Sequence, residues 1–462
     1  MAGSWVDLAE RIGADLHLDL AGPGGRRAVL TRTLREAVRS GRLAPGTRLP
    51  PYRSLAADLG LARNTVADAY AELVAEGWLI ARQGSGTVVA HRAAAPRRPP
   101  SPSPAAAPAR PVRHDLRQGL PDPGSFPRTA WLASARRALT AAPNDAFGPG
   151  DPRGRPELRN ALAAYLSRAR GVQADPDRIV ICSGVAHALR LLSGGVVRGP
   201  WAVESYGLPF HRSILGAASV RTRPLAIDEH GARTDELAGE RAVLLTPAHQ
   251  FPTGGPLHPE RRASVIDWAR TKNALVLEDD YDGDFRYDRQ PVGALQNLDP
   301  ERVAYLGSVS KSLSPAVRLG WMVLPGHLVG PVLAAKGERE AWAGVADQLT
   351  LADFIEHGAY DRHVRRMRQR YRRRRDQLVQ ALAPHTTTGI AAGLHAVLNL
   401  PAEAEKRALD AAREEGIALD GLSPFRHPEA AMPALNGLVI GYAAAPDHAF
   451  AAALDALRRA VG

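Results

Sequence analysis

The chain of 462 residues has little cysteine, little lysine and no long apolar run, and each scarcity excludes a class of protein. Its single cysteine, Cys182, cannot build a disulfide framework and fits a reducing compartment, so we expect a cytoplasmic protein. No apolar run approaches the ~18 residues of a membrane helix, so we expect no membrane partner. The first residues include acids and no apolar segment before a cleavage site, which argues against a secretory signal.

Lysine is rare because arginine carries nearly all the positive charge, and the four lysines are Lys272, Lys311, Lys336 and Lys406. Lys311 lies between two serines in "LGSVSKSLSPAVRLGW", residues 306–321. An arginine keeps its proton in a protein, whereas burial can make a lysine a neutral amine that forms an imine with an aldehyde. Two interpretations therefore compete for Lys311: an ordinary cation on a polar loop, or a reactive amine.

The positive charge is concentrated near the N-terminus. The formal net charge is +11 and the pI is near 10.2, which favours a polyanionic partner. Residues 26–92 hold eleven arginines against five acids, and "AAAPRRPPSPSPAAAPARPVRH" after them has almost nothing to bury, as is typical of a linker. We therefore expect four segments: an N-terminal arm over 1–25, a basic unit over 26–92, a Pro/Ala-rich linker over 93–115 and a large domain over 116–462.

The basic unit has the pattern of three helices and a hairpin. Apolar residues recur at helical spacing in "AVLTRTLREAVRSGRL", in "YRSLAADLG" and in "RNTVADAYAELVAEGW". The second and third of these segments are joined by a tight turn at Gly60, which is the helix-turn-helix pattern whose second helix enters a major groove. Alternating apolar and polar residues around "QGSG" predict a β-hairpin wing.

Over its full length, "GRLAPGTRLPPYRSLAADLGLARNTVADAYAELVAEGWLIARQGSGTVV" resembles a GntR-type winged helix-turn-helix domain. The resemblance implies that six residues face a double-stranded DNA operator: Arg53, Arg63, Asn64, Thr65, Gln83 and Gly84. Arginine can hold a phosphate or the N7/O6 edge of guanine, and asparagine suits adenine or phosphate. Ala62 stands where this family often has Ser or Thr, which removes one phosphate contact. The alternative is a solvated arginine surface.

After residue 115, helix-length segments alternate with short runs rich in Val, Ile and Leu: "DRIVICSG", "RAVLLTPAH", "NALVLEDDYD" and "RVAYLGSVSK". Such runs are typical of a buried parallel sheet, and α/β folds bind ligands at the carboxyl ends of the strands. Asp279 and Tyr281 end one run two residues apart, so their side chains share one side of an extended chain. A carboxylate and a phenol in this arrangement suit a pyridine ring with a 3-hydroxyl group.

Pyridoxal 5'-phosphate has such a ring, and it also needs an amine for its aldehyde and donors for its phosphate. Lys311 supplies the amine. The donors for the phosphate are Ser308, Ser310, Arg318 and the backbone amides of Gly184, Val185 and Ala186 at a predicted helix N-terminus. The sequence therefore predicts a pyridoxal phosphate site at the carboxyl ends of the strands.

The order of "SGVAHAL", "TPAHQFPTGG", "EDDYD" and "SVSKSLSPAVRLG" resembles a fold-type I aminotransferase over residues 116–462. The resemblance implies an aldimine on Lys311, a pyridinium partner in Asp279 and a 3-hydroxyl partner in Tyr281. The whole chain resembles a MocR-type regulator, in which a GntR winged helix is fused to an α/β fold-type I, pyridoxal-phosphate-dependent, aminotransferase-like domain. That family implies a transcription regulator that senses pyridoxal phosphate, often with an amine or amino acid, usually as a head-to-tail homodimer.

The chain departs from the aminotransferase pattern at several positions. Pro149 replaces a Tyr whose hydroxyl reaches the phosphate of the partner subunit, and Leu208 replaces an aromatic residue that stacks on the ring. Tyr206 could stack instead only if its loop shifts. Phe251 replaces an Asn that bonds the 3-hydroxyl group, although His249 lies close enough in sequence to compensate.

The strand near the C-terminus, "NGLVIGYA", lacks the Arg that binds a substrate carboxylate, and Arg426 is the nearest upstream candidate to bind an effector there. These losses weaken a catalytic interpretation more than a sensing one, because turnover needs a fixed substrate and sensing needs only state-dependent binding. We therefore expect a regulator without catalytic residues. The alternatives are a working aminotransferase with an accessory DNA-binding unit, and a DNA-binding protein with an empty scaffold.

Two further patterns have competing interpretations. The run "RHVRRMRQRYRRRR", residues 362–375, has nine arginines, which suit either the solvated face of a long helix or a second track for DNA phosphates. His114, His187 and His357 have no metal-ligand spacing, so we expect no metal site.

Overall fold

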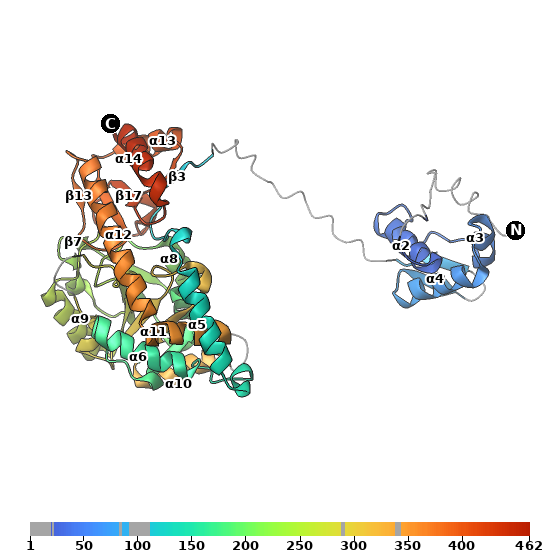
Figure 1. Ribbon diagram of the computed structural model, residues 1–462, viewed down its shortest axis with the longest axis horizontal. Coiled ribbons are helices and arrows are strands. Elements are labelled where there is room, and N and C mark those ends of the chain that lie inside the picture. Colours follow the sequence, from blue (N-terminus) through green and yellow to red (C-terminus); the bar gives the residue numbers. More distant parts are fainter. Residues whose placement is uncertain (1–19, 21–22, 83–85, 92–110, 288–291, 338–342) are drawn as a thin grey trace. The chain divides into compact units, whose positions relative to one another are not determined.

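The computed structural model describes residues 20, 23–82, 86–91, 111–287, 292–337 and 343–462, and it divides into two compact units, Met1–Ala107 and Pro108–Gly462 (Figure 1). Most of the expected arm and linker, and the wing residues Gln83 and Gly84, lie outside the described residues. Within the described residues, none of the helices is both long enough and apolar enough for a membrane span.

The small unit is a three-helix bundle with a hairpin, as its sequence pattern predicts. Its elements are α2 (Arg26–Arg39), α3 (Tyr52–Asp58), α4 (Arg63–Ala75), β1 (Leu79–Arg82) and β2 (Gly86–Val89). The two strands are antiparallel, and Val89 closes the core beneath them. Leu30 and Leu34 of α2 pack with Val66 and Leu73 of α4, and all four side chains are buried. Burial of these apolar stripes is the main force that holds the helices together.

A seven-stranded sheet forms the centre of the large unit, in the order β4-β12-β11-β10-β9-β5-β6. Its strands are β4 (Ile179–Cys182), β5 (Trp201–Glu204), β6 (Thr222–Leu225), β9 (Ala242–Leu245), β10 (Leu275–Asp279), β11 (Val303–Ser308) and β12 (Gly320–Val323). Strand β12 is antiparallel to both of its neighbours, and the other paired neighbours are parallel. The carboxyl ends of β5, β9, β10 and β11 therefore meet at one edge.

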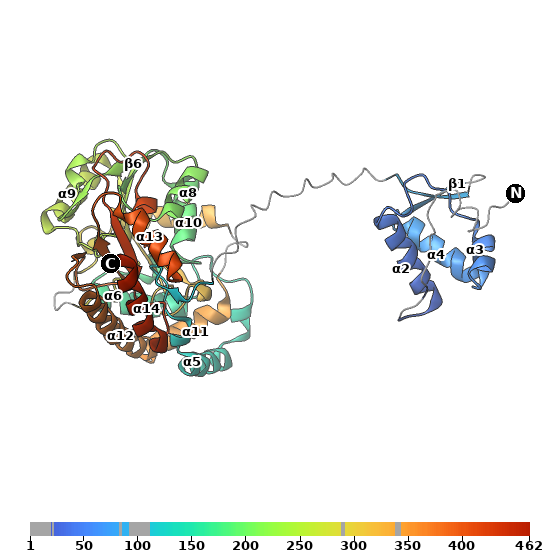
Figure 2. The ribbon, with the colours of Figure 1, turned by 90° about the horizontal axis from the view of Figure 1, so that it is seen from above.

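Helices cover both faces of this sheet, which explains why its central strands are mostly apolar and buried on both sides. The helices before the second sheet are α5 (Arg128–Ala141), α6 (Pro156–Arg170), α7 (Val185–Leu191), α8 (Pro209–Ala217), α9 (Pro259–Lys272), α10 (Gly326–Lys336), α11 (Val345–Glu356) and α12 (Ala359–Ala381). Figure 2 shows α6, α11 and α12 lying together, away from α8 and α10. Ile181 packs toward the first group and Cys182 toward the second, because neighbouring residues of a strand face opposite sides.

A second, four-stranded sheet follows α12. Its order is β13-β14-β17-β16, with β13 (Thr387–Thr388), β14 (His395–Asn399), β17 (Gly437–Gly441) and β16 (Asp420–Gly421), packed with α13 (Ala404–Glu414) and α14 (Asp447–Val461). Short pairs are formed by β3 (His114–Asp115) with β15 (Ile417–Ala418), and by β7 (Ile227–Asp228) with β8 (Gly231–Ala232). Strand β3 pairs within the large unit and lies just before residue 116, the start that the sequence predicted for this domain.

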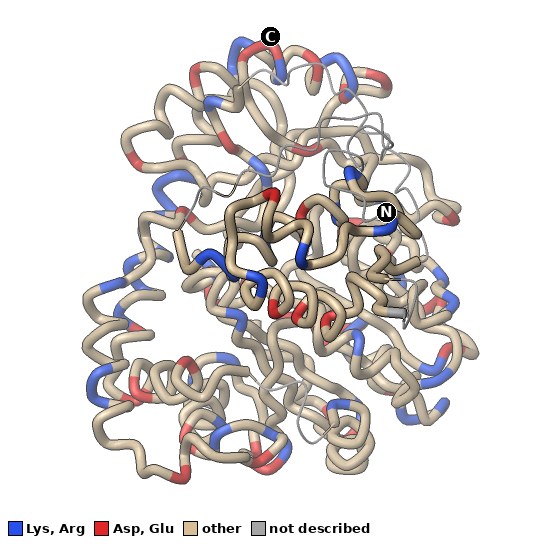
Figure 3. The backbone as a smooth tube through the Cα atoms, turned by 90° about the vertical axis from the view of Figure 1, so that its right-hand side faces the viewer, with Lys and Arg blue, Asp and Glu red and all other residues tan. Residues whose placement is uncertain are grey.

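The arginine run occupies one long helix, α12. Arg370 donates to Asp122 and Asp447, and the buried Arg374 donates to Asp447 and to the carbonyls of Tyr442 and Ala443. These two arginines fasten α12 to the end of the second sheet. Others are exposed, at positions 362, 365, 366, 368, 372 and 373, and Figure 3 shows basic and acidic positions interspersed over the backbone of both units. The hypothesis that this run forms a second track for DNA phosphates stays a prediction, and it concerns only these exposed arginines.

Candidate cofactor site and DNA-facing surface

The carboxyl ends of β10 and β11 bring Asp279 and Lys311 into one buried region. Asp279 is the last residue of β10, and Lys311 follows β11 in a turn after Ser308. The Lys311 Nζ donates to the carbonyl oxygen of Gly119 at 2.5 Å. The Oδ1 atom of Asp279 is buried and has no hydrogen-bond partner in the described parts of the chain. A buried, unpaired carboxylate oxygen is costly in free energy, so it indicates a site for a ligand that donates a hydrogen bond or carries positive charge.

The two groups shift each other's ionisation. Burial lowers the pKa of Lys311, and the charges of Asp279 and Asp282 oppose that effect. Burial, reinforced by the charge of Asp280, raises the pKa of Asp279 to about 7, while Lys311 acts in the opposite direction. A lowered lysine pKa increases the fraction of neutral amine near neutral pH, which is the form that attacks an aldehyde. Lys311 therefore has the environment of a reactive amine rather than of a loop cation.

This raised carboxyl pKa predicts a pH-dependent stability. Because folded Asp279 binds its proton more tightly than the unfolded chain does, its stabilising contribution is full below about pH 4 and is lost as the pH rises through about 7. We expect the free energy of unfolding of Asp279→Asn to fall less than that of wild type between about pH 5 and about pH 8. Urea unfolding of full-length wild type and of full-length Asp279→Asn, each without cofactor and at each pH, measures the two free energies.

Asp267→Asn is the control for this comparison, because the Asp267 side chain is 77% exposed. Its pH profile should follow that of the wild type. An unchanged slope in Asp279→Asn would show that the Asp279 carboxyl group is already ionised at acidic pH in the folded chain.

Tyr281 is held by a histidine and a second acid. Its hydroxyl group lies 3.0 Å from His249 Nδ1, which lies 2.8 Å from Asp282 Oδ2. Burial raises the pKa of Tyr281 well above its ordinary value, so the phenol keeps its proton. Phe251 packs edge-on against the Tyr281 ring at 5.8 Å between centroids. His249 thus makes the polar contact to the Tyr281 hydroxyl, whereas Phe251, two residues later, packs against the Tyr281 ring.

The expected phosphate donors come from three segments around β4, β11 and β12. Gly184 precedes α7 with a φ of 110°, and the amides of Val185 and Ala186 begin that helix. A Cβ on Gly320 would lie 2.6 Å from the Gly184 Cα, so position 320 requires glycine for the two backbones to meet, whereas position 184 favours glycine because of its positive φ. Ser308 and Ser310 are half-buried. Arg318 is exposed. Burial lowers the pKa of His187 in the first turn of α7, and the charge of Arg318 adds a smaller effect in the same direction.

The cavity beside Asp279 is lined by residues that sequence reasoning missed. Glu204, at the end of β5, accepts a hydrogen bond from Thr246 Oγ1 at 2.7 Å, and burial raises its pKa to about 8. His211 of α8 lines the same cavity, and burial lowers its pKa to about 3, helped by the charge of Lys311. Glu204 could have been found from the sequence, because it ends the apolar run "WAVE" as Asp279 ends its own run. No sequence pattern marks His211.

Two residues expected near the ring are engaged elsewhere. Tyr206 is fully buried, and its hydroxyl accepts a hydrogen bond from the Leu435 amide at 2.7 Å, so it does not stack in this conformation. Arg426 donates to the carbonyls of Ala430 and Met432 and is absent from the described lining of the cavity beside Asp279. The expectation for Arg426 rested on chain order alone, and local carbonyl acceptors hold its guanidinium instead.

A buried ion pair supports the end of β10. Arg170, the last residue of α6, donates to both carboxylate oxygens of Asp280 at 2.7 and 3.0 Å, and Tyr305 of β11 donates to the same carboxylate at 2.6 Å. The Arg170 and Asp280 side chains are 4% and 2% exposed. Because Asp280 follows Asp279 directly, this pair fixes the backbone that presents the Asp279 carboxylate.

The surface at the start of α4 displays the side chains expected to face DNA. Arg63 and Asn64 are exposed in the first turn of α4, Thr65 is half-buried behind them, and Arg53 is exposed on α3. Ala62 precedes α4 without a side-chain cap. Arg48, which we did not predict as a contact, lies at the hairpin, where a Cβ on Gly86 would be 3.2 Å from its Nε. Exposed arginines around free helix amides suit a phosphate backbone.

Comparison with known proteins decides the family. The family model "Bacterial regulatory proteins, gntR family" matches residues 27–89, and "Aminotransferase class I and II" matches residues 116–457. The probable rhizopine catabolism regulatory protein MocR of Rhizobium meliloti is 32% identical, with 93% of this chain and 92% of MocR covered. This chain belongs to the MocR-type family of transcriptional regulators.

The MocR-type chain is also 32% identical to the HTH-type pyridoxine biosynthesis transcriptional regulator PdxR of Corynebacterium glutamicum, over 89% of this chain and 91% of PdxR. Among solved structures, it is similar to the kynurenine aminotransferase of Pyrococcus horikoshii, with a TM-score of 0.68 and 23% identity over 75% of this chain and 90% of that one. At this identity the similarity shows the fold alone. The large unit of the MocR-type chain therefore has the fold-type I aminotransferase architecture that its motifs predicted.

Proposed function

We propose that this MocR-type regulator binds a double-stranded DNA operator through its small unit and holds pyridoxal 5'-phosphate at Lys311, responding to that cofactor or to an amine or amino acid. The observation that carries the proposal is the buried, unpaired Oδ1 of Asp279 in the same region as the half-buried amine of Lys311. The name of the relative PdxR, which concerns pyridoxine biosynthesis, supports this class of ligand. A protein that acts on DNA in this way works in the cytoplasm, and we propose a head-to-tail homodimer.

The residues present fit the cofactor by their chemistry. Pyridoxal phosphate supplies an electrophilic aldehyde carbon beside a pyridine ring that attracts electrons. The Asp279 carboxylate would hold a proton on the ring nitrogen, and Lys311 would offer its neutral amine. The Tyr281 hydroxyl would donate to the ring hydroxyl, oriented by His249. Ser308, Ser310, Arg318 and the amides at Gly184, Val185 and Ala186 would hold the phosphate.

Aminotransferases stack an aromatic residue on the cofactor ring, and this chain has Leu208 at that position. Leu208 and His211 both line the cavity beside Asp279. With its low pKa the His211 imidazole is neutral at physiological pH, so it can lie against a protonated ring without charge repulsion. We propose that this pair replaces the stacking aromatic residue of aminotransferases.

The experiment that tests the proposal is a footprint upstream of the protein's own gene, repeated with and without pyridoxal phosphate. We expect protection of a paired site whose extent or affinity changes with the cofactor, since a ligand shifts a conformational equilibrium only by binding its states differently. An identical footprint under both conditions would show that the large unit does not sense this molecule.

A second candidate function is turnover as an aminotransferase, which the Lys311 and Asp279 environment favours. Against it, the guanidinium of Arg426 donates to backbone carbonyls, and Arg212, which lines the cavity, donates to the carbonyls of Gly207 and Phe425. The Nη2 atom of Arg426 and the Nη1 atom of Arg212 are engaged in this conformation, whereas the Nε of Arg426 is buried without a hydrogen-bond partner in the described residues. A steady-state assay decides between the two functions: conversion of many amino-donor equivalents per site would establish an enzyme.

Arg63→Ala tests the DNA-facing surface. We expect operator affinity to fall by about tenfold or more and the slope of log affinity against log salt to decrease by about one, because one phosphate or guanine contact is lost. Fluorescence anisotropy with a labelled operator over a salt series measures both quantities. Arg39→Ala is the control: Arg39 ends α2 and already pairs with Glu36 at 3.0 Å, so its loss should leave binding unchanged. Equal effects of the two changes would point to general charge rather than to a contact.

A further inference from the structure

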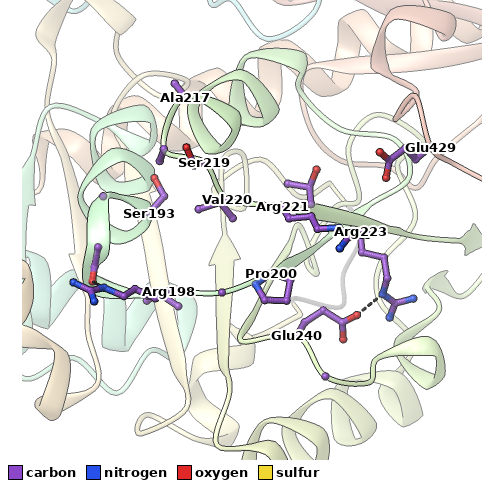
Figure 4. Close-up of a pocket in the computed structure, with 17 residues that line it drawn as sticks. Ser193, Arg198, Pro200, Ala217, Ser219, Val220, Arg221, Arg223, Glu240 and Glu429 are labelled. Carbon is purple, nitrogen blue, oxygen red and sulfur yellow. Dashed lines mark hydrogen bonds and ion pairs between the residues drawn. The ribbon is translucent and has the colours of Figure 1, made fainter.

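A large cavity lies at the opposite end of the central sheet from Lys311. It has a volume of about 1040 Å³ and is lined by the segments that lead into β5, β6 and β9 (Figure 4). Asp279 and Glu204 stand at the carboxyl ends of parallel strands, whereas Pro200, Arg221 and Glu240 stand before the amino ends of theirs. The cavity is therefore separate from the region that contains Lys311.

One part of the cavity wall offers hydrogen-bond donors without acceptors. Ser193 is only 5% exposed, and its Oγ is buried with no hydrogen-bond partner in the described ranges. Arg198 donates from Nε to the Gly195 carbonyl at 3.3 Å, which leaves its terminal nitrogens available. Arg221 is exposed, and no acceptor for its guanidinium occurs within the described residues. Figure 4 shows Ser193 and Ser219 on one side of the cavity.

The acidic residues of the lining do not cancel these donors. Glu240 is 5% exposed, pairs with Arg223 through one oxygen and accepts the Ala238 amide at 2.7 Å through the other. Glu429 is exposed at the rim, across the cavity from Ser193 in Figure 4. The lining of the cavity thus includes two arginines, Arg198 and Arg221, that have no acidic partner in the described residues, and one unsatisfied hydroxyl, which are groups that bind a carboxylate or a phosphate.

We propose that this cavity binds a small anion bearing a carboxylate or phosphate group, with the guanidinium groups of Arg198 and Arg221 and the hydroxyl of Ser193 as donors. A small molecule fits better than a nucleic acid backbone, because Ser193 lies below the surface, where a duplex cannot reach it. An unpaired buried hydroxyl costs free energy that a bound anion recovers.

The cavity is connected to the cofactor region by short, hydrogen-bonded segments. Strand β5 has only four residues between Pro200 and the end that presents Glu204. His427 Nε2 lies 3.0 Å from Thr222 Oγ1 in the cavity wall, and the His427 amide donates to the Ser205 carbonyl at 2.7 Å. A bound anion that moves the wall would therefore displace groups next to Glu204.

Isothermal titration of the full-length protein with inorganic phosphate and, separately, with succinate tests the proposal. We expect at least one of them to bind with one site per chain, and the affinity to fall at least about tenfold in the double variant Arg198→Ala/Arg221→Ala. Ser193→Ala should weaken the same binding by a smaller factor. Binding of phosphate alone would identify phosphate esters as the ligand class, and binding of succinate alone would identify carboxylates.

Two matched variants keep the test specific. Arg407→Ala removes an exposed arginine of α13 and should leave binding unchanged, and Arg318→Ala perturbs only the expected cofactor phosphate site. Absence of binding by both anions, or binding that survives the double variant, would overturn the proposal. So would a loss that follows Arg318→Ala, which would assign the anion to the cofactor region. If only duplex DNA of unrelated sequence bound through Arg198 and Arg221, the surface would be a nucleic acid contact instead.

Discussion

Lys311→Ala should abolish covalent capture of pyridoxal phosphate. Purified wild type incubated with the cofactor should absorb at about 420 nm, and borohydride should fix one adduct per chain on residue 311. The reason is that Lys311 combines a half-buried amine of lowered pKa with the nearby Asp279 carboxylate. Removal of the amine leaves nothing in this region to react with the aldehyde. Absorption spectra and mass spectrometry of proteolytic peptides measure both effects.

The other lysines provide the control. Lys336 is buried and also has a lowered pKa, but its Nζ donates to the carbonyls of Pro152 and Ile181 at 2.5 and 2.8 Å. Lys272 ends α9 on the surface. Lys272→Ala should keep the absorption and the adduct, and no adduct should form on Lys336. A wild-type chain that remains colourless with excess cofactor would favour a DNA-binding protein with an empty large domain.

Arg170→Ala should cost about 3–5 kcal/mol of unfolding free energy, because it leaves the buried Asp280 carboxylate without its cation. The pair is almost completely buried, and only the Tyr305 hydroxyl would remain as a donor to that carboxylate. The uncompensated charge next to Asp279 should also weaken cofactor binding, since it moves the Asp279 pKa further upward. Urea unfolding followed by tryptophan fluorescence measures the loss.

Arg168→Ala is the matched control in the same helix. Its side chain is 61% exposed and pairs with Asp361 at 2.9 Å, so its removal should change stability by no more than about 1 kcal/mol. The double variant Arg170→Ala/Asp280→Asn should recover part of the loss because the buried charge is removed. Equal costs for Arg168→Ala and Arg170→Ala would mean that solvent reaches the buried pair.

Sequence patterns were sufficient for residues whose roles follow from local spacing. Asp279 and Tyr281 end one apolar run, and Lys311 follows the next, so the parallel sheet had to bring them to one edge. The helix-turn-helix was equally readable, because Gly60 and the apolar stripes of α3 and α4 are local signals.

Residues brought in by tertiary packing could not be found in this way. His211 reaches the cavity because α8 turns back over the strands, and Arg170 reaches Asp280 across 110 positions of sequence. The effector role of Arg426, which was taken from chain order, stays a prediction; in the folded chain its Nη2 donates to the carbonyls of Ala430 and Met432. Burial and partner geometry, which decide these cases, are properties of the folded chain.

The start of α4 has a consequence for how the small unit meets its operator. Ala62 provides no side-chain oxygen for the first amides of that helix. Its backbone carbonyl accepts the Thr65 amide at 3.0 Å, which leaves the amides of Arg63 and Asn64 without a cap from this residue. On the proposed DNA-facing surface a phosphate would be the acceptor that suits these amides, and the duplex would then cap α4. Fraying of the first turn would then be coupled to release of the operator, and a chain carrying Ala62→Ser would separate the two.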